Sequence, residues 1–273
     1  MGATDYYNRL AMRMRDQRNP GRSREAEARR KVQTVMLRVG ATGPPINLND
    51  IAARLDVGAI RLVPLSMRGR LMLEGLDIVL EINQELSPLE QRFTIAHELC
   101  HLMLDDGRVS KSTAIGRSDR TLSTKDFSEL ERLCDVGAIE VLMPADWIRS
   151  ISLRPPSFDE AVGLAARAEV DFARLAKRLI EEGAWVGRLV WFRLHEGKPV
   201  VSKAFPEWEE DFLARMSLIG SETLVEASLR DGSMQQGNLE LQILGESHAF
   251  HANCLPVSSG TEAVALLKPV GQT

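Results

Sequence analysis

Cysteine is scarce in this 273-residue sequence. The three cysteines, Cys100, Cys134 and Cys254, are an odd number at unrelated spacings, which argues against the disulfide framework of a small secreted protein. The start of the sequence also lacks the apolar run that a secretory signal requires. We therefore expect the protein to work in the cytoplasm.

Long apolar runs are also missing, since no stretch approaches the ~20 residues that cross a bilayer. This excludes an integral membrane protein, and we expect no membrane partner. The formal net charge is only −4, so the charge of the whole chain does not favour a nucleic-acid partner either. Internal repeats and long low-complexity segments are absent. Any basic surface that contacts a partner must therefore be local.

One local basic segment is present near the start of the sequence. Residues 9–31 contain nine Lys or Arg residues and three acids, and Asn19-Pro20-Gly21 interrupts them. We expect a basic N-terminal arm over residues 1–30 that leads into a helix. The arm could contact nucleic acid or an acidic protein, but a solvated helix face is the interpretation that such a pattern favours.

Two kinds of pattern follow the arm. Residues 60–63 and 71–82 are rich in β-branched and aliphatic residues and predict short strands of a small sheet. Ser87, Pro88 and Glu90 form a helix start signal, in which serine and glutamate make a capping box and proline occupies the first turn. Helices are predicted over 88–104 and 126–143, with a polar loop over 107–125.

The pattern changes again in the last third of the chain. A helical pair is predicted over 157–169 and 171–182, and it ends at Gly183. Strand patterns then dominate, with a helix near 206–216. The later strands are expected near 222–229, 239–244 and 262–268. The fold class is therefore α+β. The expected parts are the arm at 1–30, a domain with a small sheet at 31–150, the helical segment at 151–184 and an α+β domain at 185–273.

The segment FTIAHELCHLML, residues 93–104, carries the clearest chemical signal. His97 and His101 are four residues apart on the predicted helix, so both imidazoles can reach one point, as two ligands of a tetrahedral zinc do. Glu98 is poorly placed to be a third ligand but can take a proton from water at the metal. Zinc lowers the pKa of such water to about 7.

Two core histidines on an amphipathic helix are the alternative interpretation. Burial of two imidazoles and a carboxylate within one turn costs several kcal/mol unless each group finds a partner. A metal ion is the simplest partner for all three, so the segment predicts a metal site. Cys100 projects away from the face of the histidines and is expected to be a small buried apolar residue.

A hydrolytic zinc site needs a third protein ligand and leaves its fourth position open for water. The predicted helix after the polar loop can supply that ligand, because Glu131 and Asp135 share one of its faces. Glu131 is the first choice and Asp135 the second. Asp135 could instead orient a histidine ligand through a hydrogen bond, which is a common role for a carboxylate beside a metal.

Two segments together resemble the ImmA/IrrE family of bacterial metallopeptidases. They are GLDIVLEINQELSPLEQRFTIAHELCHLML at 75–104 and ELERLCDVGAIEVLMP at 129–144. The resemblance extends over roughly residues 30–182. It implies that His97, His101 and Glu131 bind zinc and that Glu98 is the catalytic base. The sequence departs from the family pattern at four positions: Cys100 replaces glycine, Cys134-Asp135 replace Ala-Asn, and Gly137 replaces a core aromatic residue.

The resemblance also implies a function. It suggests a zincin-like domain, then a helix-turn-helix-like pair and a GAF-like sensor domain. The expected activity is zinc-dependent cleavage of a helix-turn-helix repressor that controls stress, DNA-damage or mobile-element genes, with Mn²⁺ as an alternative activating ion. A small molecule or nucleic acid could act as a signal at the C-terminal domain or the basic arm. The alternative is a non-proteolytic metal-binding regulator that acts through protein or DNA contacts.

Overall fold

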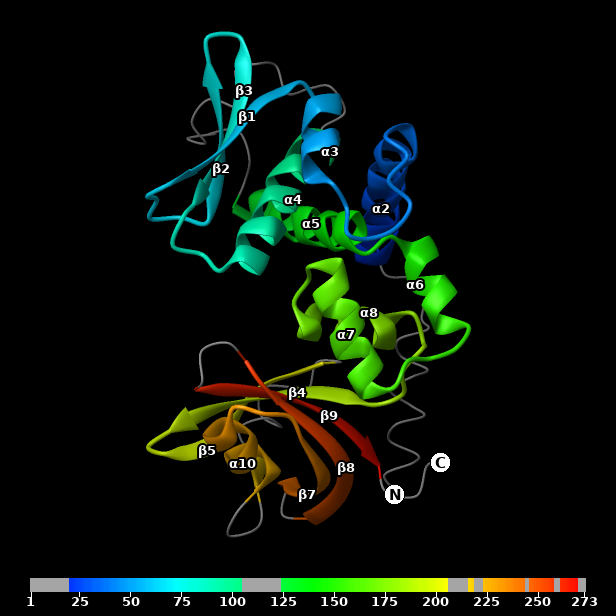
Figure 1. Cartoon of the computed structure of the whole chain (residues 1–273), viewed down its shortest axis with the longest axis vertical. Coiled ribbons are helices and arrows are strands. Elements are labelled where there is room, and N and C mark those ends of the chain that lie inside the picture. Colours follow the sequence, from blue (N-terminus) through cyan, green and yellow to red (C-terminus); the bar gives the residue numbers. More distant parts are fainter. Residues whose placement is uncertain are drawn as a thin grey trace. The chain divides into compact units, whose positions relative to one another are not determined.

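The computed structural model describes residues 20–104, 124–205, 216–218, 223–243, 246–257 and 261–269 (Figure 1). Most of the predicted arm, almost all of the polar loop and the helix expected near 206–216 lie outside these residues. Contacts divide the chain into two compact units: residues 1–147 with 167–170, and residues 148–166 with 171–273. Among the described residues, no helix combines the length and apolar character needed to cross a bilayer.

The first unit contains a three-stranded sheet in the order β1-β3-β2. Its strands are β1 (Val57–Val63), β2 (Gly69–Glu74) and β3 (Asp77–Asn83). β3 pairs in parallel with β1 and antiparallel with β2. Gly75 lies between β2 and β3 with φ of 63°, a backbone conformation that glycine adopts without strain. The predicted strands are therefore confirmed, with β3 in the centre of the sheet.

Helix α4 (Pro88–Leu104) follows β3 and has the bounds expected from the sequence. Its capping box is formed, because the Glu90 backbone N–H donates to Ser87 Oγ and Glu90 Oε2 accepts from the Ser87 N–H, both at 3.4 Å. β2 approaches the helix closely at Gly69, where an added Cβ would lie 2.7 Å from Thr94 Cγ2. The small sheet therefore packs along the first half of α4.

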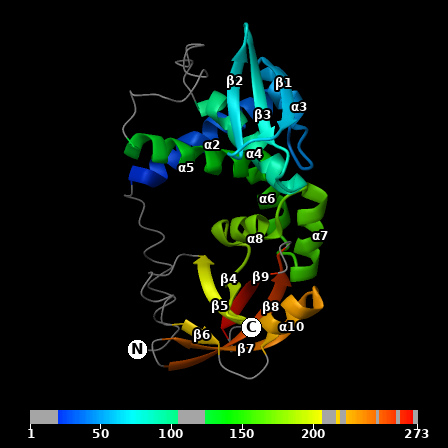
Figure 2. The same ribbon diagram turned by 90° about the vertical axis from the view of Figure 1, so that its left-hand side faces the viewer.

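Two long helices, α2 (Pro20–Arg38) and α5 (Thr124–Leu142), run side by side and pack against α4 (Figures 1 and 2). Their contact buries Val32 of α2 and Ala138 of α5 completely. A shorter helix, α3 (Leu48–Arg54), precedes β1. Residues 20–30 of the predicted arm thus form the first turns of a packed helix, and residues 1–19 lie outside the described part of the chain.

Helices α4 and α5 approach each other closely at Gly137. A Cβ on Gly137 would lie 2.7 Å from Cys100 Sγ and 3.3 Å from Val32 Cγ2. The Cys100 thiol is completely buried, and its burial raises its pKa, as expected of a structural apolar residue. Two of the departures from the family pattern therefore touch each other: the larger residue on α4 faces the smaller residue on α5.

Gly137→Ala should destabilise the protein by about 1–3 kcal/mol, because the new methyl group overlaps the Cys100 sulfur. In an open helical position the same change normally stabilises by about 0.5–1 kcal/mol. Gly163 of α7 (Phe158–Ala168) provides that control, since no other side chain lies within 4 Å of the position that a methyl group would occupy there. Denaturant unfolding of both variants, and of Gly137→Ala combined with Cys100→Gly, measures the effect. Equal stability of the two alanine variants would contradict this packing.

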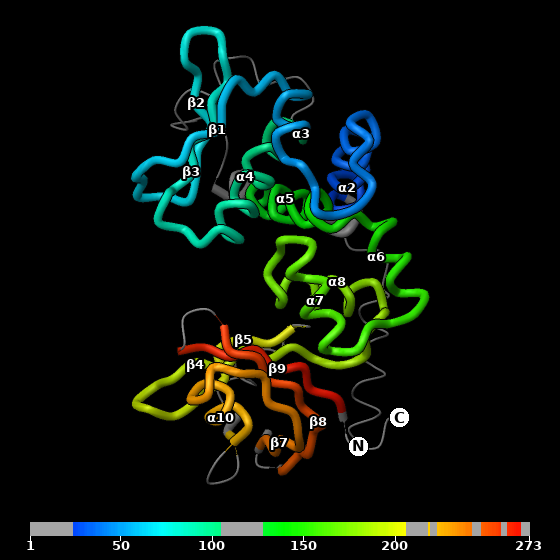
Figure 3. Tube along the Cα trace, viewed as in Figure 1, coloured from blue at the N-terminus to red at the C-terminus, as the bar shows by residue number. Residues whose placement is uncertain are grey.

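The second unit combines helices with a six-stranded sheet in the order β5-β4-β9-β8-β7-β6. Its helices are α7, α8 (Phe172–Glu181) and α10 (Leu224–Asp231). Its strands are β4 (Arg188–His195), β5 (Lys198–Phe205), β6 (Met216–Leu218), β7 (Gln235–Ile243), β8 (Glu246–Pro256) and β9 (Glu262–Pro269). All neighbouring strands are antiparallel. α10 packs on β7, β8 and β9 (Figure 3). The short α6 (Ala145–Ser152) spans the boundary between the two units.

The helical pair α7 and α8 agrees with the prediction, and it is anchored by aromatic side chains. Phe158 and Phe172 have ring centroids 4.7 Å apart, and both pack against Trp185. The Trp185 indole N–H donates to the carbonyl oxygen of Pro156 at 2.8 Å. Through these aromatic contacts, α7 and α8 pack into the core of the second unit.

The strand predicted at 222–229 is wrong, because this segment forms α10. Leu224 and Val225 suggested a strand, but Thr223 and Glu226 form a capping box that starts a helix. Val225 and Ser228 are buried on the side of the helix that packs on the sheet. Strand β8 had no counterpart among the predicted strands. The α+β class is confirmed, while the GAF-like assignment and the four-part division of the chain stay predictions.

Candidate metal centre

Helix α4 brings His97 and His101 together on one face, as their spacing predicts. Their Nε2 atoms are 3.2 Å apart. The rings meet edge to face, with centroids 4.9 Å apart. The His101 side chain is 6% exposed and that of His97 is 14% exposed, so both nitrogens lie in a largely dry environment. Two nitrogen donors therefore converge within the first unit.

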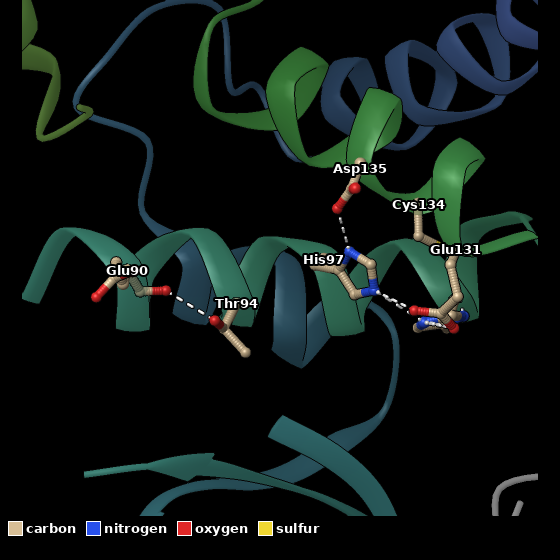
Figure 4. A network of polar contacts seen from close by, with 7 residues as sticks. Glu90, Thr94, His97, Glu131, Cys134 and Asp135 are labelled. Atoms are coloured by element: carbon tan, nitrogen blue, oxygen red, sulfur yellow. Dashed lines mark hydrogen bonds and ion pairs between the residues drawn. The ribbon is translucent and has the colours of Figure 1, made fainter. Parts of the chain in front are cut away.

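Glu131 reaches the same point from α5. Its Oε2 atom is 3.2 Å from His97 Nε2, and its Oε1 atom is 3.5 Å from His101 Nε2 (Figure 4). Zinc holds such ligands at ~2.0–2.1 Å, and the ligand atoms of a tetrahedral site are then about 3.3 Å apart. The three donors have the mutual spacing that a small divalent metal ion requires. The Glu131 side chain as a whole is 32% exposed, while its Oε1 atom is buried.

Asp135 lies on the other side of the His97 ring. Its Oδ1 atom accepts from His97 Nδ1 at 2.9 Å, as Figure 4 shows. A metal ion on the Nε2 side could not reach this carboxylate, because the two ring nitrogens point outward from different corners of the imidazole. The structure therefore places the Asp135 carboxylate at Nδ1 of His97 and brings Glu131, the first choice from the sequence, among the Nε2 donors.

The two carboxylates also determine the charge of His97. Burial of the ring works against the charged form, but hydrogen bonds to Asp135 and Glu131 outweigh it, and the pKa of His97 rises to about 9. In the metal-free protein this ring is therefore positively charged at neutral pH. A metal ion would replace that proton with its own positive charge.

Glu98 directly follows His97 and is only 4% exposed. Its negative charge is among the causes that raise the pKa of His97. A buried carboxylate that directly follows His97 is a candidate for the general base.

One residue beside the site was not assigned a role from the sequence. Cys134 of α5 is completely buried, and its Sγ atom is 3.1 Å from His101 Nδ1. His97, His101 and Cys134 form a cluster whose candidate ligand atoms all lie within 4.8 Å of one another. The signal was present in the sequence, because Cys134 follows Glu131 by three residues and so shares its helix face.

Comparison with known proteins shows which family the region of the candidate site resembles. Residues 65–179 match the family model described as the IrrE N-terminal-like domain, and the match includes both helices of the candidate site. This region is therefore similar to the ImmA/IrrE family. The resemblance found in the sequence is thereby confirmed, and the family is one of metallopeptidases.

A relative and a solved structure extend the comparison. The chain is 30% identical over 162 residues to the radiation response metalloprotease IrrE of Deinococcus deserti. That match covers 58% of this chain and 56% of the relative, so the chain spans just over half of the Deinococcus protein. A Mycobacterium tuberculosis transcriptional regulator has a similar fold, with a TM-score of 0.57 and 16% identity over 90% of this chain and 76% of that one.

Asp135→Ala should weaken metal binding by about 10–100-fold in this IrrE-like domain, because His97 would lose the partner of its Nδ1–H. Asp135→Asn should lose less, since the amide oxygen can still accept that hydrogen bond. Competition with a chromophoric chelator measures both affinities. Unchanged affinity in Asp135→Ala would show that the contact does not orient His97, whereas complete loss would indicate that Asp135 is itself a ligand.

Proposed function

We propose that this chain is a metal-dependent regulatory endopeptidase. The observation that carries the proposal is the convergence of His97 Nε2, His101 Nε2 and the Glu131 carboxylate at 3.2–3.5 Å. Glu98 is buried and directly follows His97, and the region matches a metallopeptidase family. The donor set also fits the chemistry, since two imidazoles and a carboxylate are ligands that catalytic zinc uses.

His97, His101 and Glu131 would hold the ion, with zinc as the expected metal and Mn²⁺ as an alternative activating ion. When bound, such an ion polarises the scissile carbonyl and lowers the pKa of water at the site. Asp135 holds the Nδ1–H of His97, which keeps the Nε2 lone pair directed at the other two donors.

Glu98 would move the proton in the reaction. Its carboxylate takes a proton from the attacking water as the new C–O bond forms, and then donates that proton to the amide nitrogen as the C–N bond breaks. The low exposure of Glu98, 4%, keeps bulk water away from this carboxylate. The proton taken from water thus ends on the amide nitrogen, and the Glu98 carboxylate is regenerated.

Strand β2 is the proposed docking edge for an extended substrate. Among the described strands it pairs only with β3, so its other side is an edge of the sheet. Gly69 brings β2 against Thr94 on α4, one turn before His97. Main-chain hydrogen bonds to such an edge position an extended peptide with little regard to its sequence. Selectivity would therefore come from other surfaces.

The proposed substrate is a cytoplasmic helix-turn-helix repressor whose cleavage releases stress, DNA-damage or mobile-element genes. The Deinococcus relative, described as a radiation response metalloprotease, supports a regulatory role. We further propose that the second unit regulates the peptidase or presents its substrate. A small molecule or nucleic acid would act as the signal there or at the basic arm.

The test compares two substrates. Zinc- or manganese-loaded protein is incubated with the helix-turn-helix repressor encoded beside its gene and, separately, with unfolded casein. We expect cleavage of the repressor at one or a few bonds and slow cleavage of casein. Rapid casein cleavage with an intact repressor would overturn the regulatory role. Absence of cleavage of both, despite bound metal, would favour a non-proteolytic metal-binding regulator.

A further inference from the structure

The two histidines of the candidate site are held in the same way from α5. Asp135 Oδ1 lies 2.9 Å from Nδ1 of His97, and Cys134 Sγ lies 3.1 Å from Nδ1 of His101. Both Nε2 atoms point instead toward each other and toward Glu131. Cys134 and Asp135 are adjacent on α5, and each contacts the Nδ1 atom of a histidine, which faces away from the Nε2 atoms and Glu131.

The chemistry of imidazole gives the Cys134 contact a role. A neutral imidazole carries one proton, and the nitrogen that binds a metal must be the one without it. If Nε2 of His101 binds the ion, Nδ1 carries the proton and needs an acceptor. Cys134 Sγ lies within hydrogen-bond range of this nitrogen, and it is completely buried.

We propose that Cys134 is a positioning residue that accepts the Nδ1–H of His101 and so presents the bare Nε2 to the metal. This inference rests on the metal site proposed above. Asp135 does the same for His97 with a carboxylate, whereas Cys134 does it with a sulfur atom. Because a thiol sulfur is a weak acceptor, its contribution should be the smaller of the two.

Direct binding of the metal by Cys134 is the competing explanation, and the geometry argues against it. The sulfur lies beside Nδ1 of His101, while Glu131 lies beside Nε2 of the same ring. These nitrogens point outward from different corners of the imidazole. One ion at ~2.0–2.1 Å from Nε2 therefore cannot also lie at the ~2.3 Å that a sulfur ligand requires.

The test uses Co²⁺ as a spectroscopic probe in the full-length protein. Wild-type protein should show the visible bands of a tetrahedral cobalt site without a sulfur-to-cobalt charge-transfer band. Cys134→Ala should bind Co²⁺ about tenfold more weakly in chelator competition, and Cys134→Ser should recover most of that loss because its hydroxyl oxygen can accept the same proton. Cys100→Ala is the matched control, since it removes a neighbouring buried sulfur and should leave Co²⁺ affinity unchanged.

The outcomes separate this role from the metal site itself. A charge-transfer band that disappears in Cys134→Ala would make Cys134 a ligand and overturn the positioning role. Equal affinity of wild type and Cys134→Ala would overturn it as well, while the metal site would stand. Equal weakening in Cys134→Ser and Cys134→Ala would reduce the contact to packing. Failure of wild-type protein to bind Co²⁺ would overturn both proposals.

Discussion

Glu98→Gln should retain the full metal content of the wild-type protein and lose about 10²–10⁴-fold in turnover of the repressor substrate. Glutamine has nearly the shape of glutamate, so the buried position should remain filled. Its amide cannot accept the proton of the attacking water, and the step that depends on Glu98 would be lost. Metal analysis and cleavage kinetics on the same preparation measure the two effects.

Two variants on the same helix give the comparison its controls. His97→Ala should lose both metal and activity, since it removes one of the three converging donors. Glu90→Gln should lose neither, because glutamine can keep the capping box at the helix start. If Glu98→Gln loses the ion as fully as His97→Ala does, the division between ligand and base is wrong.

Glu140→Ala should destabilise the first unit by about 3 kcal/mol. Glu140 of α5 is 1% exposed and accepts hydrogen bonds from Arg29 at 3.2 Å, from Gln33 at 2.9 Å and from the backbone N–H of Ala145 at 2.9 Å. These donors come from α2 and from the start of α6. Removal of the carboxylate would leave the three donors without this acceptor and open a cavity between the helices.

Thermal and denaturant unfolding measure this effect, with Glu129→Ala as the control. Glu129 is also an acid of α5, but its ion pairs with Arg24 and Arg132 lie at the surface, and its loss should cost less than about 1 kcal/mol. Similar losses in the two variants would contradict a structural role for the buried carboxylate. Because α5 also carries Glu131, Glu140→Ala should weaken metal binding as well.

The sequence was most informative where local rules and tertiary packing agree. The capping box at Ser87 and Glu90 predicted the start of α4, and the four-residue spacing of His97 and His101 predicted their shared face. The choice of Glu131 over Asp135 depended on helix periodicity together with the family pattern. In the structure, the Asp135 carboxylate lies at Nδ1 of His97 and the Glu131 carboxylate lies at Nε2.

Sequence reasoning failed where distant contacts decide. The segment of α10 has the β-branched and aliphatic residues of a strand, but it packs on the sheet as a helix, and the local capping-box signal of Thr223 and Glu226 was overlooked. The complementarity of Cys100 and Gly137 could not be read from either helix alone, because it depends on how α4 and α5 cross. The contact of Cys134 with His101 depends on the same crossing.

An anomalous-difference map at the zinc absorption edge, from crystals of zinc-loaded protein, tests the central claim most directly. One strong peak is expected in the first unit, about 2 Å from Nε2 of His97, from Nε2 of His101 and from a carboxylate oxygen of Glu131. A peak bonded to Cys134 Sγ, a peak more than about 4 Å from Glu131, or the lack of any peak near the two histidines would contradict it.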